Sequence, residues 1–134
     1  MECTSLVAAG YGVSVICPRG PAEARREVID GVSIRRYAPP PVAKGLPGYV
    51  WEFLYCWIVT AFLAVRIFVS EGFDAIQACN PPDTYFLLAL PFKLLRRRFV
   101  YDQHDLCPEV YRARFSRSTG PALRALYGLE RATY

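Results

Sequence analysis

The segment "GFDAIQACNPPDTYFLLALPFKLLRRRFVYDQHDLCPEV", residues 72–110, decides the fold class. Its first apolar run, residues 75–78, predicts a buried strand that ends at an Asn-Pro-Pro turn. Residues 83–97 predict a helix with Asp83 in its first turn, where a negative charge suits the helix dipole. Residues 97–104 predict the next strand, and Pro108-Glu109 predicts the start of another helix. This alternation indicates an α/β fold with parallel strands.

The flanking regions extend the same pattern. Residues 2–9 predict a helix closed by Gly10, and residues 12–17 predict a buried strand stopped by Pro18. The dipeptide Asp30-Gly31 lies between two short extended runs and predicts a tight hairpin turn. Leucines at helical spacing in residues 120–134 predict a final helix.

Composition limits the classes of protein that fit. A chain of 134 residues is the size of one domain, and 53% hydrophobic with 21% charged residues excludes a disordered chain. The formal net charge is +4, and basic residues outnumber acidic ones only from Phe92 onward. The five cysteines are scattered without a CxxC pair, which argues against a disulfide framework or a zinc site. A reducing, cytoplasmic compartment is therefore expected.

Residues 51–69 form an almost wholly apolar stretch, interrupted only by Glu52 and Arg66. Its length approaches the roughly 20 residues of a membrane-spanning helix. Two interpretations stay open, a full membrane span and a helix that is buried in the fold or lies against a membrane interface, and the second is favoured.

Two polar segments follow predicted strands and are the candidate site. Cys79-Asn80-Pro81-Pro82-Asp83 follows the strand at residues 75–78, and Asp102-Gln103-His104-Asp105 lies at the end of the strand predicted over residues 97–104. In open α/β sheets, ligands bind at the carboxyl ends of the strands. The two segments are therefore expected at one edge of a cleft.

Each candidate residue also has a structural interpretation. His104, the single histidine, either donates a hydrogen bond to a sugar hydroxyl or phosphate, or ties its loop to Asp102 or Asp105. A metal site from these three residues is disfavoured, because neighbouring strand residues point to opposite faces. Asn80 suits a turn before two prolines, and Glu109 suits the first turn of a helix.

The basic residues of the carboxyl-terminal third form either a solvated face or a surface for phosphates. They are Lys93, Arg96, Arg97, Arg98, Arg112, Arg114, Arg117 and Arg124. No nucleic-acid-binding signature accompanies them, so nucleic acid is not expected as a partner, and anionic lipid is favoured instead.

Five segments carry a resemblance to a known family. "GFDAIQACNPPDTYFLLAL" (72–90) and "RRFVYDQHDLCPEVYRARF" (97–115) closely resemble the N-terminal domain of retaining, GT-B-fold glycosyltransferases of family 4. "LVAAGYGVSVICP", "EVIDGVSIRRY" and "YGLERATY" are similar to it too. The likeness is strongest to the bacterial branch that builds exopolysaccharide, lipopolysaccharide and cell-wall sugars.

The resemblance implies a Rossmann-like parallel sheet flanked by helices, as the N-terminal, acceptor-side half of a GT-B fold. It implies that residues 1–134 are one partial domain, without the first strand and without the carboxyl-terminal donor-binding domain. It places His104 near the donor sugar as the catalytic residue, with Asn80, Asp83, Asp105 and Glu109 as substrate-binding neighbours. It implies a nucleotide-sugar co-substrate, a saccharide or lipid-linked acceptor and no catalytic metal. The chain alone is expected to be inactive.

Three hypotheses for function follow. The leading one is a glycosyltransferase fragment in the cytoplasm, peripheral on the inner face of the plasma membrane. The second is a non-catalytic, membrane-associated binding or scaffold module. The third is a small membrane protein anchored through residues 51–69.

Overall fold

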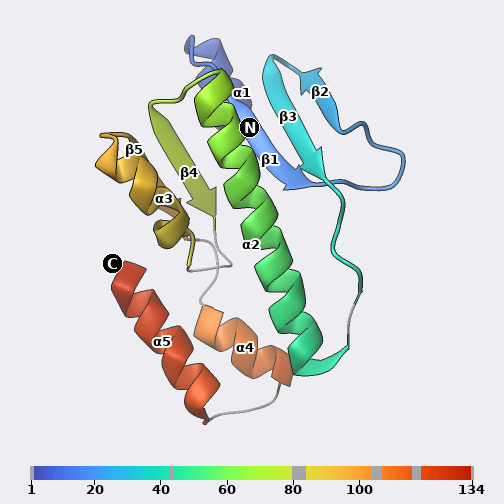
Figure 1. The fold of residues 1–134 in the computed structure, drawn as a ribbon, viewed down its shortest axis with the longest axis vertical. Coiled ribbons are helices and arrows are strands. Elements are labelled where there is room, and N and C mark those ends of the chain that lie inside the picture. The colour runs from blue at the N-terminus through green and yellow to red at the C-terminus, as the bar shows by residue number, and fades with distance from the viewer. Residues whose placement is uncertain (1, 43, 80–83, 104–106, 116–118, 134) are drawn as a thin grey trace. The chain divides into compact units, whose positions relative to one another are not determined.

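The computed structural model describes residues 2–42, 44–79, 84–103, 107–115 and 119–133 (Figure 1). The chain divides into two compact units, unit 1 over Met1–Ser70 and unit 2 over Glu71–Tyr134. Each unit combines strands with helices, and each contains a pair of parallel strands. The predicted α/β class with a parallel sheet and flanking helices is confirmed.

Unit 1 contains a three-stranded sheet in the order β1-β3-β2. Its elements are α1 (Glu2–Ala8), β1 (Ser14–Pro18), β2 (Arg26–Ile29), β3 (Val32–Tyr37) and α2 (Gly45–Ser70). Strands β1 and β3 are parallel, whereas β2 runs antiparallel to β3. The arrows of β1 and β3 point the same way in Figure 1, so both strands end at one edge of the sheet.

The hairpin between β2 and β3 confirms the prediction made from Asp30-Gly31. Both residues have positive φ, 49° and 80°, as a two-residue hairpin turn of the favoured hand requires. A Cβ atom added to Gly31 would lie 2.7 Å from Cγ1 of Val7 in α1. Glycine is therefore needed at this position both for its backbone conformation and for the close approach of α1.

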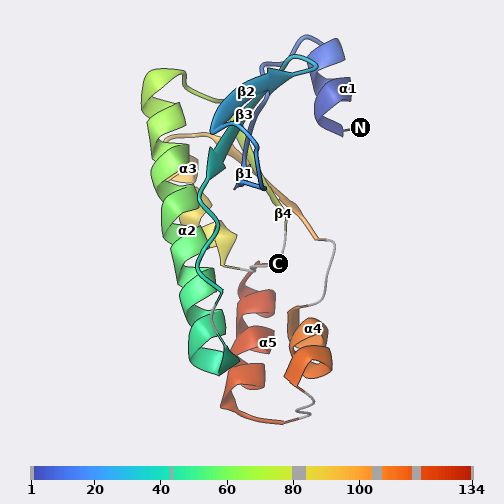
Figure 2. The same cartoon turned by 90° about the vertical axis from the view of Figure 1, so that its right-hand side faces the viewer.

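Helix α2 is longer than the predicted 51–69, because it begins at Gly45 and ends at Ser70. Within unit 1 it runs beside the sheet, and its amino-terminal half extends past the strands in both views (Figures 1 and 2). Ala64 and Ile67 are buried, while the side chains of one face are exposed. We call this face the α2 stripe; it consists of Val50, Trp51, Leu54, Ile58, Phe62, Val65 and Val69.

Unit 2 is a strand–helix–strand unit followed by two helices. Its elements are β4 (Ala75–Cys79), α3 (Tyr85–Leu94), β5 (Arg98–Asp102), α4 (Cys107–Phe115) and α5 (Pro121–Thr133). Strands β4 and β5 are parallel and pair Ala75 with Arg98 through to Cys79 with Asp102. Leu88, Ala89 and Phe92 of α3 are buried, and the Phe92 ring meets the Phe73 ring edge-on at 5.0 Å.

One predicted helix is too long at both ends. Residues 83–97 were expected to be helical, but α3 begins at Tyr85, after Thr84 at the N-cap position, and ends at Leu94. Asp83 therefore precedes the first turn of the helix and itself lies outside the described residues. The carboxyl end falls early because Arg96 has a positive φ of 61°, which a helix cannot continue through.

Candidate functional site

The carboxyl ends of β4 and β5 bring Cys79 and Asp102 together. The two residues are direct partners across the parallel pair, and each is the last residue of its strand. The Asp102 carboxylate accepts hydrogen bonds from Nε2 of Gln77 at 3.4 Å and from Sγ of Cys79 at 3.9 Å. Gln77 and Cys79 are two residues apart, so both side chains leave β4 on the same face. This edge therefore presents a half-buried carboxylate beside two polar donors.

Most predicted site residues cannot be placed. Asn80, Asp83, His104 and Asp105 lie outside the described residues. Glu109 is described: it lies in the first turn of α4 with an exposed side chain, where its charge suits the helix dipole. Within the described residues, no three His, Cys, Asp or Glu side chains are grouped closely enough to hold a metal ion.

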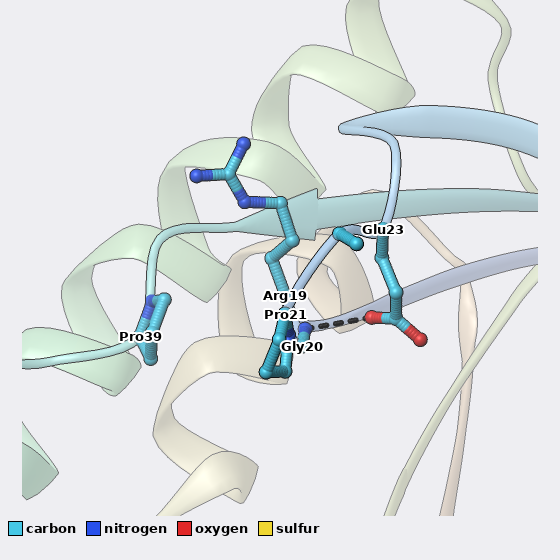
Figure 3. A pocket seen from close by; sticks show the side chains of 6 residues that line it. Arg19, Gly20, Pro21, Glu23 and Pro39 are labelled. Carbon is cyan, nitrogen blue, oxygen red and sulfur yellow. Dashed lines mark hydrogen bonds between the residues drawn. The ribbon is translucent and has the colours of Figure 1, made fainter.

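A second candidate region, which the sequence did not predict, lies at the carboxyl ends of β1 and β3. A pocket of about 520 Å³ opens there, between the loop after β1 and the segment after β3. We call it the loop pocket; it is lined by Arg19, Gly20, Pro21, Ala22, Glu23 and Pro39 (Figure 3). Because the strands are parallel, this is the edge of the sheet at which open α/β folds bind ligands.

The loop pocket is held in shape by Glu23. Its Oε2 atom accepts a hydrogen bond from the backbone N–H of Gly20 at 2.6 Å, drawn as the dashed line in Figure 3. The same oxygen lies 3.0 Å from Nε of Arg36 on β3. The backbone N–H of Arg19 donates to the carbonyl of Tyr37 at 2.8 Å, which fixes the start of the loop to the end of β3. The loop is thus tethered to the sheet at both of its sides.

Arg36 is the centre of an ion-pair network under this loop. Its guanidinium pairs with Glu23 and Glu27 and donates to the carbonyl of Ala24 at 3.2 Å. The Arg36 side chain is only 7% exposed, and burial alone would lower its pKa, but the hydrogen bond to Glu27 and the charge of Glu23 raise that pKa overall. Burial also raises the pKa of the Cys17 thiol, and the charge of Arg36 opposes this only in part. The single charge of Arg36 is therefore shared between two carboxylates, those of Glu23 and Glu27.

Arg19 differs from Arg36 in having no carboxylate beside it among the described residues. The side chain is half-buried in the pocket wall. Figure 3 shows it and the Glu23 carboxylate pointing in different directions. The sequence signal for this region was an Arg-Gly-Pro run directly after a buried strand, which resembles an ordinary turn. Among the described residues, the loop pocket therefore presents one cation, Arg19, with which no carboxylate pairs, at the ligand-binding edge of the sheet.

Comparison with protein families gives a match to the model described as a glycosyl transferase 4-like domain, over residues 2–134. No curated protein matches the sequence significantly, and no solved structure does so. The family match covers both units and includes both strand-end regions described above. The chain therefore belongs to the family of glycosyl transferase 4-like domains.

Proposed function

We propose that the protein is the acceptor-side domain of a retaining glycosyltransferase of family 4. It transfers a sugar from a nucleotide-sugar donor to a saccharide or lipid-linked acceptor, in bacterial surface-polysaccharide or cell-wall assembly. The observation that carries the proposal is the family match over residues 2–134. In this proposal, the residues that bind the nucleotide-sugar donor belong to a carboxyl-terminal half outside residues 1–134. Residues 1–134 alone therefore transfer no sugar.

Parallel pairing in unit 2 supports the proposed position of the reaction. Because Cys79 lies opposite Asp102, the segments that follow β4 and β5 leave the sheet from the same edge. His104 comes two residues after Asp102, and we assign it the contact with the transferring sugar. There it stabilises the charge that develops as the bond from the anomeric carbon to the diphosphate breaks and the acceptor oxygen bonds to that carbon, while the proton of the acceptor hydroxyl passes to the departing diphosphate. The step uses no catalytic metal, and its substrate-binding neighbours are Asn80, Asp83, Asp105 and Glu109.

The transfer proposal is tested with the whole gene that contains this sequence. Extracts of cells carrying the gene or its deletion are supplied with radiolabelled nucleotide sugars, and label in polysaccharide and lipid fractions is counted. We expect transfer to depend on the gene and His104→Ala to lower its rate roughly 100-fold. Arg131→Gln, at an exposed position of α5, is the control and leaves the rate unchanged.

Each contrary result of that assay has one meaning. Transfer that is equal with and without the gene contradicts the enzymatic proposal and supports the scaffold hypothesis. Gene-dependent transfer that survives His104→Ala contradicts only the site assignment. Capture of the native protein with an antibody tests the missing half, because a captured mass of 15.1 kDa would contradict it.

We also propose that the protein is cytoplasmic and binds the inner face of the plasma membrane through the α2 stripe. Within the described residues, α2 is the one helix long and apolar enough to cross a membrane by length and composition. Two exposed side chains lie near its ends, Trp51 near the amino-terminal end and Arg66 near the carboxyl-terminal end. The Arg66 guanidinium lies 5.8 Å from the centre of the Phe62 ring. Tryptophan and arginine both favour the headgroup region, and the charge of Arg66 suits anionic lipid.

Vesicle flotation tests the membrane proposal. The purified chain is mixed with vesicles of phosphatidylcholine, with or without phosphatidylglycerol. We expect it to float with the vesicles, more strongly when they are anionic, and Ile58→Glu in the α2 stripe to abolish flotation. Val42→Glu places the same charge at a 95% exposed valine outside α2 and serves as the control. Equal effects of both variants would contradict the proposal, and resistance of the cellular protein to carbonate extraction would favour a full span.

A further inference from the structure

The backbone that lines the loop pocket is held in a fixed conformation. Pro21 and Pro39 have fixed φ angles, and Ala22 is held at a φ of 62°, which residues other than glycine rarely adopt. Two backbone attachments and the Arg36 network hold the loop against the sheet. A loop that is already ordered loses little conformational entropy when a ligand binds.

The charges around the loop pocket select the kind of ligand. Oε2 of Glu23 is engaged by Arg36 and by the N–H of Gly20, and the carboxylate points in a different direction from Arg19 (Figure 3). Arg19 has no carboxylate beside it among the residues that the structure describes. A guanidinium donates two parallel hydrogen bonds to a pair of oxygen atoms on one phosphate or carboxylate. The loop pocket is therefore complementary to an oxyanion.

The size of the pocket indicates what carries that oxyanion. Its volume of about 520 Å³ falls in the range of small-molecule sites and leaves room for more than a single phosphate. Pro21, Ala22 and Pro39 add apolar walls beside the cation. We infer that the loop pocket binds a sugar that carries a phosphate or carboxylate group, and that Arg19 is the binding residue. That the anionic group is carried by a sugar, and that this sugar is the acceptor, rests on the proposed function.

Binding to the full 134-residue chain tests the inference without any transfer reaction. The chain is labelled with ¹⁵N and titrated with glucose 6-phosphate, glucuronate and neutral glucose. We expect the two anionic sugars to shift the amide signals of the loop after β1 saturably, and glucose to leave them in place. Tighter binding of glucose 6-phosphate identifies phosphate as the preferred group, and tighter binding of glucuronate identifies carboxylate.

Two arginines of the same loop give a matched pair of variants. Arg19→Gln removes the cation of the pocket and is expected to weaken binding roughly tenfold or more. Arg25→Gln makes the same change at an exposed position that does not line the pocket, and is expected to leave affinity within about twofold. Arg19→Lys keeps the charge without the planar fork, so intermediate affinity is expected. It also provides the test if Arg19→Gln fails to fold.

The inference is wrong if neither anionic sugar binds saturably, if glucose binds equally well, or if both glutamine variants weaken binding to the same degree. The failure of the proposed function is a separate result. If extracts transfer sugar but the chain binds neither probe, the inference falls and the transferase stands. If the probes bind through Arg19 but the gene supports no transfer, the anion site stands and only its assignment to an acceptor falls.

Discussion

The two units place a carboxylate at the carboxyl edge of a parallel strand pair and stabilise it in different ways. In unit 1, Glu23 pairs with the guanidinium of Arg36 and accepts a hydrogen bond from the backbone N–H of Gly20. In unit 2, Asp102 accepts from the neutral side chains of Gln77 and Cys79. Each edge also holds a cysteine. Cys17 lies opposite Arg36 in the pairing of β1 with β3, and Cys79 lies opposite Asp102 in the pairing of β4 with β5.

The difference bears on what each edge can bind. Within the described part of unit 1, Arg19 is the cation of the loop pocket with which no carboxylate pairs, so this edge suits an anionic group. Asp102 accepts hydrogen bonds from neutral donors at the edge of unit 2, and a carboxylate of this kind also accepts from sugar hydroxyls. A transferase needs both kinds of contact, because its substrates combine hydroxyl groups with phosphates.

The largest effect is expected from breaking the support of the unit 2 edge. Phe92 is 5% exposed and packs edge-on against Phe73. Phe92→Ala removes this buried ring and should cost about 3–5 kcal/mol of unfolding free energy. Hydrogen exchange of the amides in α3 and β5 measures the loss. Leu94→Ala, at a 78% exposed position of the same helix, should change exchange little, and equal losses in both variants would show that Phe92 is not a core residue.

A smaller loss of unfolding free energy is expected from changing the hairpin of unit 1. Gly31→Ala puts a Cβ at a φ of 80° and 2.7 Å from Val7, and should cost about 1–3 kcal/mol. Both tryptophans, Trp51 and Trp57, lie in α2, so their fluorescence during urea unfolding reports on unit 1. An alanine Cβ at Gly12 meets nothing within 4 Å, so Gly12→Ala is the control. If it destabilises as much as Gly31→Ala, the hairpin explanation is wrong.

A smaller effect is expected from the Arg36 network itself. Arg36→Gln removes the charge that pairs with Glu23 and Glu27, so the loop after β1 should open more often. Trypsin should then cut at Arg25 about fivefold faster, which mass spectrometry of the fragments can follow. High salt should speed the cut in the original chain and have less effect in the variant, because salt screens the ion pairs.

The matched control removes an ion pair from the other unit. Asp74→Asn breaks the pair with Arg97, in which the Asp74 side chain is 99% exposed. Cleavage at Arg25 should keep its original rate in this variant. A faster cut would show that the loop responds to any loss of charge, and that the Arg36 network has no special part in holding it.

Much of the fold was predictable because its signals are local. Asp30-Gly31 predicted the hairpin, since both positions need positive φ and few residues accept it. The apolar run at residues 75–78 predicted β4 correctly as a strand, but the expected burial was wrong, because its residues alternate between exposed and half-buried. The end of α3 was missed, since Arg96 is a good helix former placed by tertiary context in a left-handed conformation.

The loop pocket could not be predicted, because the loop after β1 and the segment after β3 come together only when the two strands pair in the sheet. Arg19 meets the end of β3 only through the parallel pairing of β1 with β3, which no spacing in the sequence reveals. Arg19 is one of 16 Lys and Arg residues, whereas His104 is the only histidine and drew attention by its rarity. The exposed face of α2 was hidden for another reason: the helix is apolar on all sides, so periodicity cannot say which side faces outward.

The smallest expected effect concerns the thiol of the unit 1 edge. Burial raises the pKa of Cys17 above its ordinary value of 9.0, so the folded chain holds this proton more tightly than the unfolded chain. The resulting stability is fully present below about pH 9 and is lost as the pH rises through the folded pKa. Urea unfolding from pH 6 upward should therefore give parallel stability curves for the original chain and Cys17→Ala up to about pH 8, above which the original should fall more steeply. Curves that stay parallel at high pH would mean that the Cys17 thiol is as well solvated in the folded chain as in the unfolded chain. The thiol would then not interact with the charges around Arg36.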